Sequence, residues 1–339
     1  MFNWLRSLSR RKKSKVSVLL LVFVFMLSAC GGESSSEAEN HAPDKENTSE
    51  TERKAVEIDN LGVKHVYAEP PKRVVTLNQH ATEVMLKLGL EKTMVGTAYL
   101  DDEILPEYSE AYQQVPVLSD EYPSKEVFFA ASPDFAYAGW KSAFTEKSLG
   151  TRDELEQAGI HTYVQQSSNM PSPTLEDVYA DILNIGRIFQ VEEKAQDVVE
   201  GMKEQLSEIK SKIGEVEKAP EVFVYDSGEE KAFTAANTYL THLLDMIGAH
   251  NIFDDVDKGW VEVSWEEVVN RNPEFIVIMD YGNTTVEQKK QLLLSKPELA
   301  DVPAIKNERF IVLPLSAAAE GIRAPIALQT LASGLYPER

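Results

Sequence analysis

Residues 126–135 read EVFFAASPDF, and residues 266–275 read EEVVNRNPEF. In both segments a glutamate opens a predicted helix, a proline follows seven residues later, and an apolar run begins two residues after the proline. These runs, Phe135 to Ala138 and Phe275 to Met279, are short and unbroken. Such runs are typical of parallel strands that are covered on both faces. The chain therefore carries one helix–strand unit twice.

A second pair of segments repeats in the same order. Residues 82–89 read TEVMLKLG, and residues 241–248 read THLLDMIG. Each predicts a short amphipathic helix that a glycine ends. Because both pairs keep their order on either side of residue 200, they indicate an internal repeat. We expect two similar lobes.

Further strands and a long helix complete this architecture. Predicted strands open the first lobe at 73–77 and the second at 221–225, and another follows at 309–313. Strands that alternate with helices favour mainly parallel sheets. Between the lobes we expect a helix over 175–189, capped by Thr174, and a second over 192–213, about 33 Å long at 1.5 Å per residue. The predicted fold class is α/β, with two Rossmann-like lobes bridged by one long α-helix.

The first 29 residues are typical of a targeting signal. Six basic residues precede an apolar stretch from Val16 to Leu27, which Ser17 alone interrupts. That stretch is shorter than the roughly 20 residues that a membrane-spanning helix needs, so we expect a cleaved signal peptide. Residues 27–31, LSACG, resemble the bacterial lipobox. The resemblance implies that Cys30 becomes the mature N-terminus and carries a lipid, with an ordinary secretory signal as the alternative.

Composition bounds the rest of the mature chain. Cys30 is its only cysteine, so no disulfide forms within the chain. Removing six of 34 basic residues leaves 28 against 55 acidic ones, a net charge of −27, which argues against nucleic acid as a partner.

The mature chain is predicted to have four parts. They are a flexible tether over 30–54, an N-terminal lobe over 55–173, linking helices over 174–214 and a C-terminal lobe over 215–339.

From about residue 56 onward the chain resembles the iron-siderophore and vitamin B12 class of ABC transporter substrate-binding proteins. The resemblance rests on segments 71–77, 81–83, 88–89 and 133–135, on the long linking helix, and on 263–267 leading to Asn272-Pro273. It implies the class III periplasmic-binding-protein fold, with a ligand in a shallow cleft between the lobes. It also implies a monomeric lipoprotein on the outer face of a bacterial cytoplasmic membrane, which delivers an iron chelate to a permease dimer with its ATPase. No cofactor is expected except the N-terminal lipid.

In that family each lobe presents a surface glutamate to the permease. By position these correspond to Glu126 and Glu266, with Glu267 as a register alternative for the second. The alternative interpretation is that each carboxylate only begins a helix, where the helix dipole favours it.

Cleft residues are expected on loops that follow strand ends, where open α/β sheets bind ligands. Aromatic rings there offer broad contact to a flat ligand, and arginine pairs with anionic oxygens. Core packing is the alternative for each aromatic. Because Arg323 and Lys141 are cationic, we expect an anionic ferric siderophore. The ligand-binding candidates are Asn78, His80, Tyr99, Trp140, Lys141, Phe233, Trp260, Tyr281 and Arg323.

Other functions remain open at this point. A cobalamin or haem receptor of the same fold is one alternative, and a sensor or adhesin is another. A zinc or manganese receptor would need several histidines or carboxylates from both lobes, but the chain has six histidines and no His-rich loop. An enzyme is not expected, because Ser207 and Lys210 lie on the polar side of the linking helix and the chain has no G-x-S-x-G or phosphate-binding motif.

Overall fold

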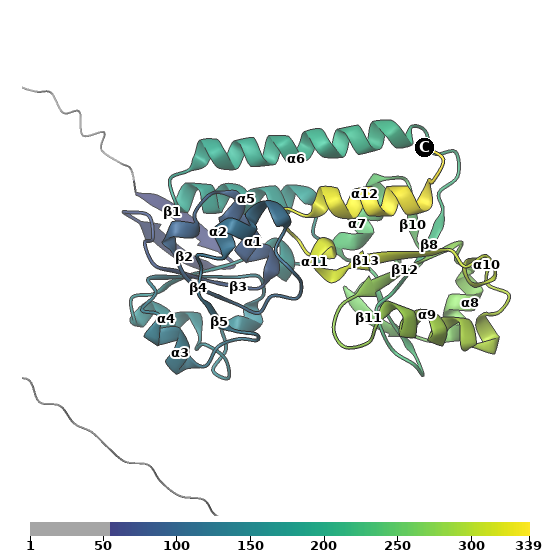
Figure 1. Cartoon of the computed structure of the whole chain (residues 1–339), viewed down its shortest axis with the longest axis horizontal. Coiled ribbons are helices and arrows are strands. Elements are labelled where there is room, and N and C mark those ends of the chain that lie inside the picture. The colour runs from purple at the N-terminus through teal and green to yellow at the C-terminus, as the bar shows by residue number, and fades with distance from the viewer. Residues whose placement is uncertain (1–54) are drawn as a thin grey trace, which may run out of the picture. The chain divides into compact units, whose positions relative to one another are not determined.

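The repeat found in the sequence is a repeat of topology. The computed structural model describes residues 55–339, and Figure 1 shows two α/β lobes within them. The first lobe has a five-stranded parallel sheet in the order β5-β4-β3-β6-β7. Its strands are β3 (Val74–Leu77), β4 (Met94–Ala98), β5 (Val117–Ser119), β6 (Phe135–Ala138) and β7 (His161–Val164).

The second lobe repeats this order without the outermost strand. Its parallel sheet runs β10-β8-β12-β13, which corresponds to β4-β3-β6-β7 of the first lobe. The strands are β8 (Glu221–Tyr225), β10 (His250–Asn251), β12 (Phe275–Asp280) and β13 (Phe310–Pro314). The expectation of two lobes with parallel sheets is confirmed.

The four echoed segments form equivalent helices. Helices α1 (Gln79–Lys87) and α7 (Tyr239–Met246) come before β4 and β10, and α3 (Lys125–Ala130) and α8 (Trp265–Arg271) come before β6 and β12. All four residues of β3 and of β6 are buried, so neither strand alternates between apolar and polar positions.

Two antiparallel hairpins accompany the sheets. They are β1 (Val56–Asn60) with β2 (Val63–Tyr67), and β9 (Ala232–Ala235) with β11 (Trp260–Val263). The remaining helices on the lobes are α2 (Ser109–Tyr112), α4 (Arg152–Gln157), α9 (Val286–Ser295), α10 (Pro303–Lys306), α11 (Leu315–Ala318) and α12 (Ala324–Leu335).

Helices α5 (Leu175–Ile188) and α6 (Glu192–Ile213) connect the lobes, and α6 runs along both of them at the top of Figure 1. α6 ends at Gly214, whose φ of +69° suits glycine at a helix end. The predicted apolar stripe of α6 is buried, and each of its Val, Met, Leu and Ile side chains contributes about 1.5–3 kcal/mol when it is fully buried. The stripe consists of Ala195, Val199, Met202, Leu206, Ile209 and Ile213.

One apolar core runs beneath these helices and through both lobes. It joins side chains of α1 and β3 to side chains of α5, α6, α7 and α12. Each lobe has in addition a smaller core on the other face of its sheet. Because α6 packs on a core that both lobes share, it acts as a rigid connector.

The predicted signal peptide, Cys30 and the tether lie outside the described residues. Within residues 55–339, no helix is long and apolar enough to cross a membrane.

Candidate ligand-binding cleft

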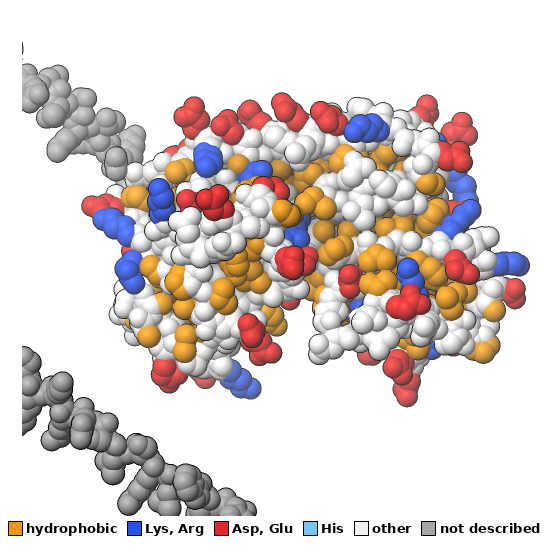
Figure 2. Space-filling model, viewed as in Figure 1, with side chains coloured by type: hydrophobic (Ala, Val, Ile, Leu, Met, Phe, Trp, Pro, Cys, Tyr) orange, Lys and Arg blue, Asp and Glu red, His pale blue; other side chains and the backbone are white. Residues whose placement is uncertain are grey.

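The strand order reverses at one place in each lobe. In the first lobe it reverses between β3 and β6, and in the second between β8 and β12. Ligands of open α/β sheets bind at the carboxyl ends of the strands at such points. The loops there begin with Asn78 and Gly139 in the first lobe, and with Asp226 and Tyr281 in the second. Figure 2 shows a hollow between the two lobes with acidic side chains on both sides of it.

Asn78 organises the first-lobe side. Its side-chain oxygen accepts hydrogen bonds from Gly139 N at 3.2 Å and from Tyr122 Oη at 3.3 Å. Asn78 has a φ of +78°, and Tyr99, which directly follows β4, has a φ of +59°. Such left-handed backbone costs about 1–3 kcal/mol and gathers at functional sites. Two strained residues at neighbouring strand ends therefore mark this edge.

Aromatic rings of the first lobe gather around Asn78. Tyr99 packs edge-on against Tyr122 at 4.7 Å between ring centroids, and His80 packs edge-on against Trp140 at 5.0 Å. Burial lowers the pKa of His80 to about 4, so its ring is neutral at pH 7. The structure thus brings together Asn78, His80, Tyr99 and Trp140, with the exposed Lys141 next in the chain.

The second-lobe side is also aromatic. Phe233 on β9 and Trp260 on β11 stack at 5.9 Å with an interplanar angle of 24°, and Trp260 keeps 38% of its surface exposed. Tyr281 Oη donates to Asp226 Oδ2 at 2.8 Å. Asp226 is tied to Phe233, whose backbone oxygen accepts from Asp226 N at 3.0 Å. Phe233, Trp260 and Tyr281 thus form one cluster, but Phe233 and Trp260 lie on the β9–β11 hairpin and not, as the sequence had predicted, on loops after strand ends.

Arg323 does not face an open hollow. It is 6% exposed, and its guanidinium donates to both oxygens of Glu83, at 2.8 and 2.5 Å. Further bonds reach Asp102 Oδ2 at 3.2 Å, the Glu103 carbonyl at 2.6 Å and Ser316 Oγ at 2.9 Å. Arg323 therefore joins the second lobe to the first. Arg323 therefore does not support an anionic ligand, because its guanidinium donors already bind groups of the protein.

A protonatable carboxyl lies beside this contact. The Glu320 carbonyl accepts from Gln165 Nε2 of the first lobe at 3.0 Å. Burial raises the pKa of the Glu320 carboxyl to about 7, although the Ser168 hydroxyl, which also lies 3.3 Å from His80 Nε2, favours its charged form. Next to it, a Cβ on Gly321 would lie only 2.9 Å from His80 Cβ, so the close approach of the lobes requires glycine there.

Sequence reasoning missed four residues of this region: Tyr122, Ser168, Asp226 and Glu320. The strand-end rule would have found Asp226, because it directly follows β8. The other three lie on loops whose position depends on the tertiary fold, so no local signal marks them.

The two predicted docking glutamates occupy equivalent positions. Glu126 and Glu266 are each the second residue of a helix that a serine caps, and both are exposed. The backbone N–H of Glu126 and the Ser124 hydroxyl hold the pKa of the Glu126 carboxyl below its usual range. Glu267 instead accepts from the backbone of Ser264 at 3.2 Å, in a capping box. Glu266 is therefore the freer of the two second-lobe carboxylates.

Comparison with known proteins places the chain among binding proteins. Residues 74–317 match the family model described as "Periplasmic binding protein". The uncharacterized ABC transporter substrate-binding lipoprotein YvrC of Bacillus subtilis is 26% identical, over 97% of this chain and 98% of its own. A vitamin B12-binding protein of Vibrio parahaemolyticus is 26% identical over 61% of this chain and 70% of its own. The crystal structure of a periplasmic binding protein from Veillonella parvula has a TM-score of 0.78 and 34% identity, over 84% of this chain and 98% of that one.

We expect Arg323→Met to lower the free energy of unfolding by about 3–5 kcal/mol, because it leaves the buried Glu83 carboxylate without its partner. Chemical denaturation measures this change. The matched control is Lys218→Met in the exposed pair with Glu274 (2.9 Å), which should cost less than about 1 kcal/mol. The double variant Arg323→Met/Glu83→Met should cost less than the sum of the two single changes. Additive costs would mean that the pair does not couple the lobes.

We expect Glu320→Gln to stabilise the protein more at pH 8 than at pH 4.5. A carboxyl whose folded pKa is raised binds more protons in the folded state, so its contribution to stability is lost as the pH rises from about 4.5 to about 7. The difference between variant and wild type should grow by up to about 3 kcal/mol across that window. Denaturation midpoints at both pH values test this, and a pH-independent difference contradicts it. Glu208→Gln on the exposed face of α6 is the control.

Proposed function

Because the chain belongs to the periplasmic binding protein family and is an ABC transporter substrate-binding protein, we propose that it captures a metal chelate between its lobes and delivers it to a membrane permease. Proteins of this family bind their substrate and do not transform it, so no catalytic residue is assigned.

The observation that carries the proposed ligand class is the chemistry of the cleft. Aromatic rings approach it from both lobes, while the expected arginine is engaged by Glu83 and Asp102. Burial raises the pKa of Asp101, and Asp226 lies on the second-lobe side. An anionic ligand would meet these carboxyl groups with Lys141 as its counter-charge on the first-lobe side, because Lys289 beside Tyr281 is buried and donates to the Met279 carbonyl. A chelate with neutral or positive net charge avoids that repulsion.

Two chelates of this kind are candidates. One is a ferric siderophore of neutral or positive charge, such as a hydroxamate complex, in keeping with the sequence resemblance. The other is a corrinoid, because a flat macrocycle suits the stacked Phe233–Trp260 pair, and a relative is named for binding vitamin B12. Haem is less suited, since its propionates need cationic partners.

The proposed cellular location of the protein rests on Cys30. We propose that Cys30 carries a lipid and holds the protein on the outer face of the cytoplasmic membrane. The Bacillus subtilis relative, which matches nearly the whole chain, is named as a lipoprotein.

The docking surface is proposed on α3 and α8. Glu126 and Glu266 lie at equivalent positions on the two lobes and are exposed, as a partner with twofold symmetry requires. On α3 the neighbouring Val127 and Phe129 are each 42% exposed, which adds apolar surface to the contact.

We expect cyanocobalamin or a neutral ferric hydroxamate to bind with a 1:1 stoichiometry that isothermal titration calorimetry can measure. Trp140→Ala and Trp260→Ala should each weaken binding about 10–100-fold, which is about 1.4–2.7 kcal/mol. The control is Trp265→Phe, because Trp265 is buried in the second lobe and its Nε1 donates to the Glu229 carbonyl at 2.9 Å. Binding of an anionic ferric catecholate alone would contradict the proposed ligand class.

We expect Glu126→Lys and Glu266→Lys to abolish transport while leaving ligand affinity unchanged, because they reverse the charge offered to the permease but lie outside the cleft. Uptake of labelled ligand by cells, with calorimetry on the purified variants, separates these effects. Glu208→Lys on the exposed face of α6 should transport normally. Normal uptake by the Glu126→Lys/Glu266→Lys double variant would exclude docking through these residues.

A further inference from the structure

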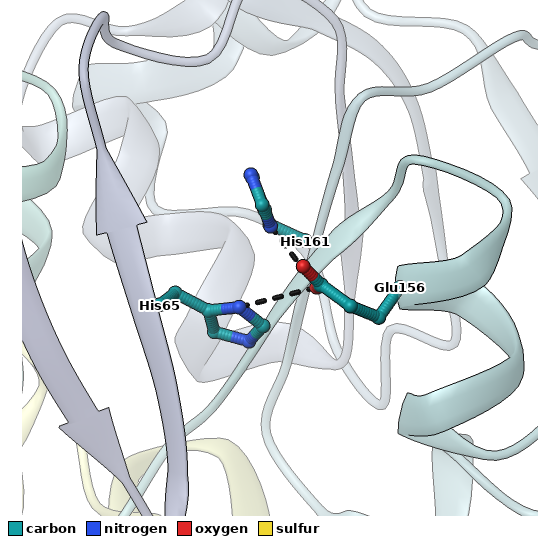
Figure 3. A group of neighbouring side chains, drawn as sticks. All are labelled: His65, Glu156 and His161. Atoms are coloured by element: carbon teal, nitrogen blue, oxygen red, sulfur yellow. Dashed lines mark hydrogen bonds and ion pairs between the residues drawn. The ribbon is translucent and has the colours of Figure 1, made fainter.

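Two histidines and a glutamate converge on the first lobe (Figure 3). Glu156 on α4 places one carboxylate oxygen 3.1 Å from Nδ1 of His65 on β2 and 3.0 Å from Nδ1 of His161 on β7. The two imidazole rings lie 5.0 Å apart between centroids. His65 of the β1–β2 hairpin thus meets Glu156 and His161, which lie on consecutive elements about 90 residues further along the chain.

This cluster does not belong to the cleft. His161 is the first residue of β7, and its register partner Phe135 is the first residue of β6. The cleft loops leave the carboxyl ends of the strands, so the cluster lies at the opposite edge of the same sheet. The inference drawn from it therefore does not rest on the proposed function.

The geometry of the three side chains suits a transition-metal ion. One ligand atom from each of the three lies within 4.8 Å of the other two. Imidazole nitrogens and a carboxylate oxygen bind Zn²⁺ at about 2.0–2.2 Å, so small side-chain rotations bring these atoms into a tetrahedral arrangement. Two histidines and one carboxylate leave a fourth position for water. The set has no thiolate, which would favour softer ions.

The surroundings leave polar groups that the protein does not satisfy. His65 and Tyr67 are each 3% exposed, and His65 Nε2 and Tyr67 Oη have no hydrogen-bond partner within the described chain. The Tyr67 ring packs edge-on against His161 at 5.3 Å. Unpaired buried polar groups are costly, and an ion bound at Nδ1 of His65 leaves Nε2 of the same ring to water or another polar group.

Protonation and access also permit metal binding. Burial lowers the pKa of His65, against the attraction of Glu156, and a lowered pKa favours the neutral ring that a metal ion binds. The side chains of His161 and Glu156 are 36% and 44% exposed, which opens the cluster to solvent. The Arg152 guanidinium is close enough to lower the pKa of His65 further and opposes a cation, but its donors are directed at Asn60 and Thr162.

We propose that His65, Glu156 and His161 form a Zn²⁺ site that fastens the β1–β2 hairpin to the first lobe. The hairpin supplies His65, and the lobe supplies the other two ligands. A bound ion replaces the two contacts that one carboxylate oxygen makes with the histidines by three direct bonds. It stabilises the folded state because the unfolded chain does not hold these groups together.

The test is a titration of the full chain, free of any histidine tag, with ZnCl₂ and no chelate ligand. We expect one Zn²⁺ per chain and a rise in the thermal unfolding midpoint that grows with Zn²⁺ concentration. His161→Ala and Glu156→Gln should each weaken Zn²⁺ binding at least tenfold and remove the midpoint shift. Co²⁺ should give the visible absorption of a tetrahedral site in wild type and not in these variants.

His250→Ala is the matched control. His250 also contacts carboxylates, Glu221 at 2.6 Å and Asp254 at 3.2 Å, but through opposite nitrogens of its ring. This variant should bind Zn²⁺ like wild type. Absence of Zn²⁺ binding below millimolar concentration overturns the proposal, and so does binding that His161→Ala and Glu156→Gln leave unchanged. Because Glu156 is partly exposed, Glu156→Gln keeps the test valid if His161→Ala fails to fold.

Discussion

The contact between Arg323 and Glu83 is the constraint on which the cleft depends. A guanidinium with so little exposure must be paired, because an unpaired charge in that position would cost several kcal/mol. Its partners, Glu83 and Asp102, belong to the other lobe, so the charges are satisfied only at one relative position of the lobes. Buried ion pairs add little net stability compared with apolar packing. Here the pair acts mainly to fix how the lobes meet.

The same contact determines the chemistry that the cleft offers. With Arg323 engaged, the groups at the strand ends are mostly aromatic rings, amides and carboxyls. Asn78 is held by Gly139 and Tyr122, and Tyr281 is held by Asp226. These bonds orient the loops before any ligand arrives, and preorganisation of this kind raises affinity. Recognition of a bulky chelate would then rest on shape and aromatic contact more than on charge.

The connector helices extend this rigidity across the molecule. Because α5, α6 and α12 pack on a core that includes side chains of both lobes, separating the lobes would expose apolar surface as well as break the ion pair. If the permease binds through Glu126 and Glu266 as proposed, this rigidity keeps the two carboxylates at a constant spacing. The His65–Glu156–His161 cluster lies at the other edge of the first-lobe sheet, where the β1–β2 hairpin packs.

The sequence by itself determined the features that depend on local patterns. Unbroken apolar runs located the strands, the apolar stripe located α6 from Glu192 to Ile213, and the echoed segments placed Glu126 and Glu266 at equivalent helix starts. Strand ends also predicted where Tyr99, Trp140 and Tyr281 lie, since the position of a loop in an α/β sheet follows from its place after a strand.

Contacts between residues that are distant in the sequence could not be predicted from local patterns. Arg323 looked like a free cation because Glu83, 240 residues away, gives no local signal of pairing with it. His65 carried no signal of a partner in the sequence, and only the folded hairpin brings it to His161. Tertiary structure decided these pairings because charge satisfaction and ligand geometry depend on distance in space.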